Sequence, residues 1–256
     1  MGRLTSKSFK VTGIVIGKRN FFESDKIIEI LTLEKGKIRC VVKGARKPTS
    51  KLAGGTELFT YGVFSLANGK NLDILTSATP KNHFQKASGN LKDVSQLFLV
   101  SEALGKLIPQ EVPNETIFNE TLEVFKSVND NHKPYIIYEY LYKLIVLLGY
   151  GLSLDVCARC HTDITTLGAK NTISINLGGL LCEKCQTDYH SSRTFSEGSI
   201  KLLKYIENYP IDEYVKITFA DDLGEELKRL INLYLNFIYQ HELKSPRFIK
   251  SIEALK

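Results

Sequence analysis

Four of the five cysteines form two closely spaced pairs, Cys157-Ala-Arg-Cys160 and Cys182-Glu-Lys-Cys185, with 21 residues between them. Two thiolates three positions apart on a tight turn can bind one metal ion, and two such turns supply four sulfurs in a tetrahedron. The spacing is close to that of a zinc ribbon. The sequence therefore predicts one zinc ion bound by Cys157, Cys160, Cys182 and Cys185.

Such a site is structural rather than catalytic, because four sulfur ligands leave no open position for water. Two other interpretations of the cysteines remain. Free buried thiols are disfavoured by the polar residues inside both pairs, and a thioredoxin-like redox pair is disfavoured because no parallel-sheet pattern surrounds them. Cys40 stands alone in a predicted strand and is expected in the core. This cysteine usage favours a reducing compartment, so we expect a cytoplasmic protein.

Basic residues are concentrated in the first third of the chain. The whole sequence carries 34 Lys and Arg against 28 Asp and Glu, whereas residues 1–80 carry 14 against 6 and residues 81–256 carry 20 against 22. All of the excess positive charge therefore lies in residues 1–80, which indicates a polyanionic partner for that part of the chain.

A predicted strand over Gly36–Lys43 separates its side chains with a period of two. Lys37, Arg39 and Lys43 fall on one face, and the opposite face is apolar. The loop at residues 44–51 follows with three more cations, and two further cations lie at the end of the first predicted strand. The candidate nucleic-acid contacts are Lys18, Arg19, Lys37, Arg39, Lys43, Arg46, Lys47 and Lys51.

Aromatic side chains lie among these cations and could stack on bases. The candidates are Phe21, Phe22, Phe59 and Tyr61, although Phe59, like Phe64, is expected in the core. Since no side chain is placed to read base edges, we expect binding that is independent of DNA sequence.

The first 80 residues have the pattern of an all-β domain. Five segments rich in Val, Ile, Phe and Thr are separated by turn residues, and no helical period lies between them. They are Phe9–Arg19, Lys26–Glu34, Gly36–Lys43, Glu57–Ala67 and Asn71–Thr79. Five short strands in this length favour a five-stranded barrel with the oligonucleotide-binding (OB) fold at residues 1–80.

After Pro80 the hydrophobic period becomes helical. We expect helices that begin near Leu91, Asn114, Pro134, Ser196 and Leu223, with Glu139 and Lys143 paired on the third. Tyr214–Phe219 is expected as a short strand. The fold class is therefore α+β and multidomain: an OB-fold barrel at 1–80, then an α-helical domain at 81–256 that carries the four-cysteine zinc module at about 155–190.

Motifs of common enzyme classes are missing from the sequence. It has no GxxxxGK[ST] phosphate loop, no GxGxxG fingerprint and no HExxH, and its carboxylates are dispersed through amphipathic segments. The most apolar stretch, Tyr135–Leu152, carries Glu139 and Lys143 and is expected as a core helix rather than a membrane span. We therefore expect a protein that is not an enzyme and does not bind membranes.

Several short motifs follow one another along the chain. They are Gly13-Ile14-Val15, Arg19, Glu23, Asp25, Thr32 with Gly36-Lys37, Val42-Lys43-Gly44-Ala45-Arg46-Lys47 with Ser50, Gly178-Gly179, and Leu243-Lys244-Ser245-Pro246-Arg247-Phe248. In combination they resemble the RecO family of bacterial recombination mediators. The cysteine pairs match the zinc-bearing members of that family.

This resemblance implies a DNA repair and recombination protein of the RecF pathway that acts at the nucleoid. It implies binding of single- and double-stranded DNA, annealing of complementary strands, and help in loading RecA onto strands coated with single-stranded DNA-binding protein. It also implies two protein partners, RecR and the C-terminal tail of single-stranded DNA-binding protein. By the same resemblance, Lys43, Arg46 and Lys47 lie in the DNA-contacting region.

Two rival interpretations remain. A zinc-ribbon nuclease or nucleic-acid-modifying enzyme could use the barrel to dock its substrate. A scaffolding protein could use the same basic barrel to bind an acidic protein. Cleavage of DNA that depends on divalent ions would favour the first rival, and failure to bind short oligonucleotides at low salt would favour the second.

Overall fold

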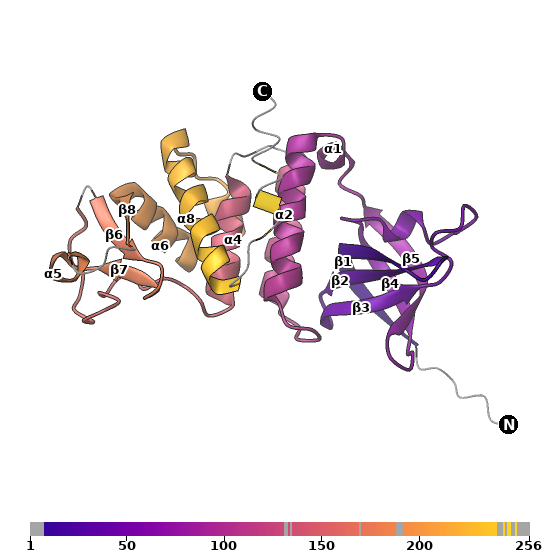
Figure 1. Cartoon of the computed structure of the whole chain (residues 1–256). Coiled ribbons are helices and arrows are strands. Elements are labelled where there is room, and N and C mark those ends of the chain that lie inside the picture. The colour runs from indigo at the N-terminus through magenta and orange to yellow at the C-terminus, as the bar shows by residue number, and fades with distance from the viewer. Residues whose placement is uncertain are drawn as a thin grey trace. The chain divides into compact units, whose positions relative to one another are not determined.

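The computed structural model describes residues 8–130, 133, 135–168, 170–187, 192–239, 243, 245–246 and 249. Pro134 and three of the six residues of the motif at residues 243–248 (Lys244, Arg247 and Phe248) lie outside these residues. The chain divides into two compact units, residues 1–130 with 248–256 and residues 131–247. Figure 1 labels most of the elements of both units, but not η1, α3 and α7.

The first unit begins with a closed five-stranded barrel. Its strands are β1 (Ser8–Phe21), β2 (Asp25–Thr32), β3 (Gly36–Val42), β4 (Tyr61–Ala67) and β5 (Asp73–Asn82), with a 3₁₀ turn η1 (Gly54–Thr56) before β4. The order around the barrel is β1-β2-β3-β5-β4, and β3 and β5 are the parallel pair. All five predicted strands and the OB fold are confirmed.

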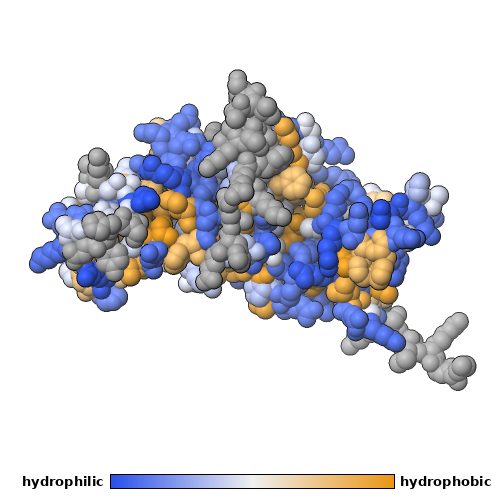
Figure 2. Space-filling model, viewed as in Figure 1, coloured by the Kyte–Doolittle hydropathy of each residue, from blue (hydrophilic) through white to orange (hydrophobic). Residues whose placement is uncertain are grey.

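Alternating side chains of the strands fill the barrel interior. Among the fully buried residues are Val15, Ile28, Cys40, Phe64 and Leu66. The predictions that Cys40 and Phe64 belong to the core are therefore confirmed. On the face that Figure 2 shows, hydrophilic residues cover much of the barrel surface, with apolar residues between them.

Three helices follow the barrel within the described residues 83–130 of the first unit: α1 (Gln85–Ser88), α2 (Leu91–Leu107) and α3 (Glu115–Asp130). The side chains of Asn90 and Asn114 accept hydrogen bonds from the first turns of α2 and α3. The ring of Phe59, which precedes β4, packs edge-on against Phe98 of α2 and Phe125 of α3. These contacts join the helices to the barrel, so this compact unit extends beyond the predicted boundary at residue 80.

The start of β3 is also tied to the segment after α2. Gly36 has φ +65°, and a Cβ there would lie 2.2 Å from the Val112 carbonyl oxygen. The amide of Glu111 donates to the Lys37 carbonyl over 2.9 Å. Only glycine can occupy this turn without moving the backbone.

The second unit is built on the buried helix α4 (Ile136–Leu147). The elements after it are β6 (Lys170–Ser174), β7 (Gly179–Leu181), α5 (Glu183–Gln186), β8 (Arg193–Ser196), α6 (Glu197–Asn208), α7 (Ile211–Tyr214) and α8 (Asp221–Tyr239). The three strands form a sheet in the order β7-β6-β8. The strand predicted at Tyr214–Phe219 is wrong, because this segment contains the end of α7, a turn and irregular backbone.

The charged residues of α4 contact other elements instead of each other. Lys143 Nζ donates to the carbonyls of Ile206, Glu207 and Tyr209 at the end of α6, over 2.9–3.0 Å. Glu139 pairs with Lys133 over 3.0 Å. The predicted Glu139–Lys143 pair is therefore wrong, because the i,i+4 rule describes exposed helix faces and α4 is buried on all sides.

No helix within the described ranges is both long and apolar enough to cross a membrane.

Burial raises the pKa of Glu139 to about 7, although Lys133 opposes the shift. The folded chain therefore binds more protons than the unfolded chain between about pH 4.5 and 7, so this group's contribution to stability is lost as the pH rises through that window. Relative to Glu139→Gln, the wild-type free energy of unfolding should fall by up to about 3 kcal/mol from pH 4.5 to 8. Urea unfolding followed by circular dichroism measures this difference, and parallel pH curves for the two proteins would contradict it.

Candidate metal centre and nucleic-acid interface

The first cysteine pair lies on a tight turn in the second unit. The amide of His161 donates to the Cys157 carbonyl over 2.9 Å, and the Cys157 amide donates to the Thr162 carbonyl over 2.9 Å. His161 adopts φ +59°, the left-handed conformation that reverses the chain directly after Cys160. The turn thus brings the two thiols of this pair to the same side of the backbone.

The second pair begins where β7 ends. Cys182 precedes α5, and its carbonyl accepts hydrogen bonds from the amides of Cys185 and Gln186 over 2.9 and 3.0 Å. At the start of β7, a Cβ on Gly179 would lie 2.5 Å from the Ser153 carbonyl oxygen. Glycine at this position lets β7 approach the segment that leads to the first pair.

The four sulfurs converge at one point. The Sγ atoms of Cys157, Cys160, Cys182 and Cys185 lie within 4.8 Å of one another, and those of Cys160 and Cys182 are 3.7 Å apart. A tetrahedron with metal–sulfur bonds of about 2.3 Å has sulfurs separated by about 3.8 Å. The predicted ligand set therefore forms a cluster with dimensions that fit one four-coordinate metal ion.

The surroundings favour thiolates on the first turn. Hydrogen bonds from the hydroxyl and amide of Thr162 lower the pKa of Cys160 to about 6. Burial opposes ionisation of Cys157, but backbone amides that include that of Cys182 outweigh burial and lower its pKa. Burial raises the pKa of Cys185 to about 12. Metal ions bind thiolates, so the lowered pKa of Cys160 and Cys157 favours metal binding at the first turn.

In the first unit, the tip of the β1–β2 hairpin meets the segment after β3. The nearly buried carboxylate of Asp25 accepts the Gly44 amide over 2.8 Å and Lys43 Nζ over 2.9 Å. The amide of Arg46 donates to the Ser24 carbonyl over 2.9 Å, and Arg46 Nη1 donates to the Phe22 carbonyl over 3.2 Å. We refer to Phe22, Asp25, Lys43, Gly44 and Arg46 as the tip cluster.

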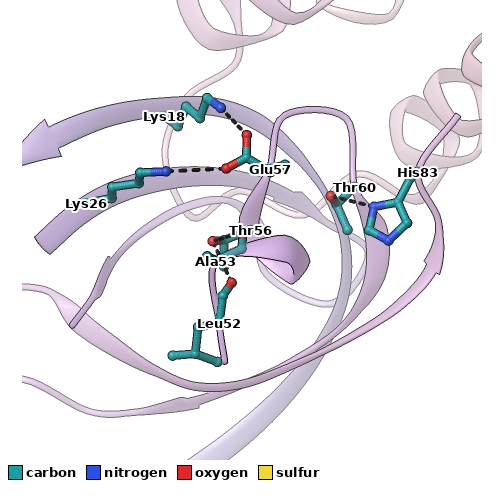
Figure 3. A network of polar contacts seen from close by, with 8 residues as sticks. All are labelled: Lys18, Lys26, Leu52, Ala53, Thr56, Glu57, Thr60 and His83. Atoms are coloured by element: carbon teal, nitrogen blue, oxygen red, sulfur yellow. Dashed lines mark hydrogen bonds and ion pairs between the residues drawn. The ribbon is translucent and has the colours of Figure 1, made fainter. Parts of the chain in front are cut away.

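Two further cations lie on the strands that form this hairpin. Lys18 on β1 and Lys26 on β2 both form ion pairs with Glu57, which precedes β4 (Figure 3). Burial raises the pKa of Glu57, but the two ammonium groups outweigh it and hold the pKa below its usual range. Lys26 was not among the predicted contacts. Its position directly after the hairpin turn, next to the predicted cations of the first strand, is the sequence feature that could have identified it.

The predicted cationic face of β3 is interrupted. Lys37 is only 3% exposed, and its ammonium group donates to the carbonyls of Leu104 and Gly105 at the end of α2. The expectation that Lys37 lies on an exposed face is therefore wrong, because α2 covers the start of β3. Arg39 is exposed but forms an ion pair with Glu29 on the neighbouring strand.

The remaining predicted cations are exposed. Among the residues that the structure describes, Arg19, Arg46, Lys47 and Lys51 have no ion pair with a carboxylate. Arg19 lies two positions before Phe21, at the end of β1, and the other three lie on the segment that follows β3. The tip of the hairpin and this segment therefore gather most of the predicted cations, while Lys37 lies at the opposite end of β3.

The predicted stacking aromatics separate into buried and exposed residues. Phe59 is buried, as expected for the core. Tyr61 is half-buried and lies beneath Lys81. Phe22 is 75% exposed and contacts the ring of Phe21, with ring centroids 4.2 Å apart. Of the four candidates, Phe22 is thus the most exposed, since Phe21 and Tyr61 are half-buried.

Comparison with protein families gives two adjacent matches. Residues 6–84 match the family described as "Recombination protein O N terminal", and residues 90–247 match "Recombination protein O C terminal". The first match covers the barrel, and the second covers helices α2 to α8 and the four-cysteine cluster.

Similar proteins match nearly the whole chain. The DNA repair protein RecO of Roseiflexus sp. (strain RS-1) is 28% identical over 253 residues, which cover 98% of this chain and 88% of that protein. RecO of Desulforamulus reducens is 25% identical, with 95% and 94% covered, and RecO of Listeria innocua is 28% identical, also with 95% and 94% covered. With both family models matched in order along one barrel and one helical, cysteine-bearing region, the chain belongs to the RecO family of DNA repair and recombination proteins.

Proposed function

We propose that the chain is a non-enzymatic recombination mediator that binds single- and double-stranded DNA without sequence specificity and anneals complementary strands. One observation carries this proposal. The tip cluster and the segment that follows β3 place Arg19, Lys43, Arg46 and Lys47 around one end of an OB-fold barrel. The strand 2–3 face and neighbouring loops of this fold commonly bind oligonucleotides.

Charge neutralisation explains how such a surface would promote annealing. Two complementary strands repel each other through their phosphates, and a cationic surface that contacts both strands lowers this repulsion. Base pairing then supplies the specificity, so the protein need not read sequence. Four of the candidate cations have no carboxylate partner among the described residues, and a phosphate can bind them without displacing an internal ion pair.

Membership of the RecO family supports three further parts of the proposal: the place where the protein acts, its protein partners and its role with RecA. We propose that the protein acts in the cytoplasm at the nucleoid, with RecR and the C-terminal tail of single-stranded DNA-binding protein as its partners. In this role it helps RecA replace the coat protein on single strands. Within this scheme residues 1–80 form the DNA-binding domain, and the helical domain at residues 81–256 carries the metal module.

We further propose that the four-cysteine cluster holds one structural zinc ion. The ion would supply four metal–sulfur bonds that link the first turn to the second. The local core consists of little more than Cys157, Leu181 and Cys185, with three partly buried neighbours. Zinc binding in small modules is worth on the order of 10 kcal/mol, which such a core cannot supply.

The double variant Arg46→Glu and Lys47→Glu reverses two charges on the segment after β3. It should weaken DNA binding at least tenfold in 50 mM salt. It should also reduce the salt slope of log K by about 1.4, the share of two phosphate contacts on a single strand. The free energy of unfolding should change by no more than about 1 kcal/mol, because both side chains are exposed and the change removes the Arg46 contact with the Phe22 carbonyl but no ion pair. Fluorescence anisotropy with a labelled oligonucleotide, together with an annealing assay, measures these effects.

The matched control reverses Lys201 and Lys216, two exposed lysines of the second unit, and so changes the net charge equally. If the control weakens binding as much as the double variant does, the barrel end is not the DNA site. DNA cleavage that depends on divalent ions would instead favour the nuclease.

Replacing Cys157 with Ser should lower the zinc content from about one ion per chain to near zero and destabilise the metal module. DNA binding by the barrel should be much less affected, because the cysteines lie in the other compact unit. Metal analysis by mass spectrometry and thermal unfolding measure the first effect. Absence of zinc from freshly purified wild-type protein would refute the proposed zinc site.

A further inference from the structure

Phe22 is a large apolar residue whose side chain is mostly exposed to solvent. The pairing of Phe21 with Asp25 closes the hairpin and leaves residues 22–24 as its loop. Phe22 is 75% exposed, the highest value among the large hydrophobic residues in the described part of the chain. Its one ring contact there is with Phe21. The ring therefore contributes little to the core of the barrel.

The backbone at Phe22 adopts a conformation that does not suit phenylalanine. Its φ of +49° lies in the left-handed region, where bulky residues are rare and unfavourable. The tip cluster maintains this conformation, since the Arg46 guanidinium binds the Phe22 carbonyl and the Arg46 amide binds that of Ser24. Strained residues of this kind are concentrated at functional sites. A glycine would satisfy the same turn, so the turn itself does not require the ring.

The charges around the ring restrict its possible partner. Arg46 contacts the Phe22 backbone directly, and Lys43 lies in the same tip cluster. Lys47 follows Arg46 in the sequence, and Arg19 lies three residues before Phe22. A ligand that offers an apolar face and negative charge together fits this environment. A nucleotide of a single strand does so, because its base has a π-face and its phosphate is attached one sugar away.

We propose that Phe22 stacks on one unpaired base of single-stranded DNA and thereby distinguishes single strands from duplex. This inference rests on the proposed DNA-binding function and adds to it a residue and a preference. In a duplex each base is already stacked on its neighbours, so the ring can reach a base only by unstacking it. When annealing pairs the base, Phe22 loses its contact, and the duplex product is held less tightly than the strands were.

Phe22→Ala should lower the affinity for a single-stranded oligonucleotide between about fivefold and 150-fold, the effect of one base stacked on one aromatic ring. Affinity for a blunt duplex of the same length should not change. Because stacking releases no counterions, the salt slope should also stay as in the wild type, in contrast to the Arg46 and Lys47 reversal. Phe22→Tyr should retain the single-strand affinity.

A direct optical test is available because the chain contains no tryptophan. In Phe22→Trp, single-stranded DNA should quench the fluorescence of the single indole, and duplex DNA should leave this fluorescence unchanged. Phe237→Trp is the control, at a position on α8 that is 46% exposed. Its indole fluorescence should change with neither single-stranded nor duplex DNA. Phe22→Gly separates folding from binding, since it should keep or raise the melting temperature while losing the single-strand preference.

Equal loss of single- and double-strand affinity in Phe22→Ala, or an indole at position 22 that does not respond to single strands, would overturn this inference. Either result would leave the proposed function intact if the Arg46 and Lys47 reversal still weakens DNA binding at least tenfold. If Phe22→Ala instead retains full DNA affinity and loses binding to a protein partner, the exposed ring is a protein contact and the base-stacking proposal is wrong.

Discussion

The carboxylate of Asp25 is the group on which the basic end of the barrel depends. It is nearly buried, and its two oxygens accept the amide of Gly44 and the ammonium group of Lys43. The Gly44 amide in the first place, and then Lys43, lower the pKa of Asp25, so the carboxylate stays charged at neutral pH. This contact fixes the segment after β3 against the β1–β2 hairpin, and the Arg46 contacts to the hairpin loop follow from it.

The cations at this end of the barrel are of two kinds. Lys18, Lys26 and Lys43 form internal ion pairs, which organise the barrel end and partly cancel its charge. Arg46 and Lys47 keep their charge available, because neither has a carboxylate partner within the described residues. The positive surface proposed for DNA is thus smaller than the count of basic residues in the first third of the sequence suggests.

Local chemical rules accounted for what could be predicted from sequence. The four-cysteine cluster followed from the cysteine spacing, because two tight turns suffice to bring the sulfurs together. The strands of the barrel followed from alternation, including the buried face of β3 with Cys40. The burial of Lys37 could not be predicted from the local pattern. Its burial depends on the end of α2, whose carbonyls come from residues more than 60 positions away in the chain.

Two predictions for the second unit were wrong for a similar reason, because they considered each segment without its neighbours. The Glu139–Lys143 pair is correct for an isolated helix, but α4 is enclosed, so each charge found a partner on another segment. Tyr214–Phe219 has residues that favour strands, yet no neighbouring strand pairs with it among the described residues. Phe22 was predicted only as one of four aromatic candidates. Its exposure and left-handed backbone became visible once the tip cluster was in place.

The central claim is that DNA binds the end of the barrel at the tip cluster. Chemical acetylation of lysines, measured by mass spectrometry with and without a saturating single-stranded oligonucleotide, tests it most directly. Lys43 and Lys47 should become protected, while the exposed Lys201 and Lys216 should react at unchanged rates. Unchanged reactivity of Lys43 and Lys47 on the fully bound protein would contradict it.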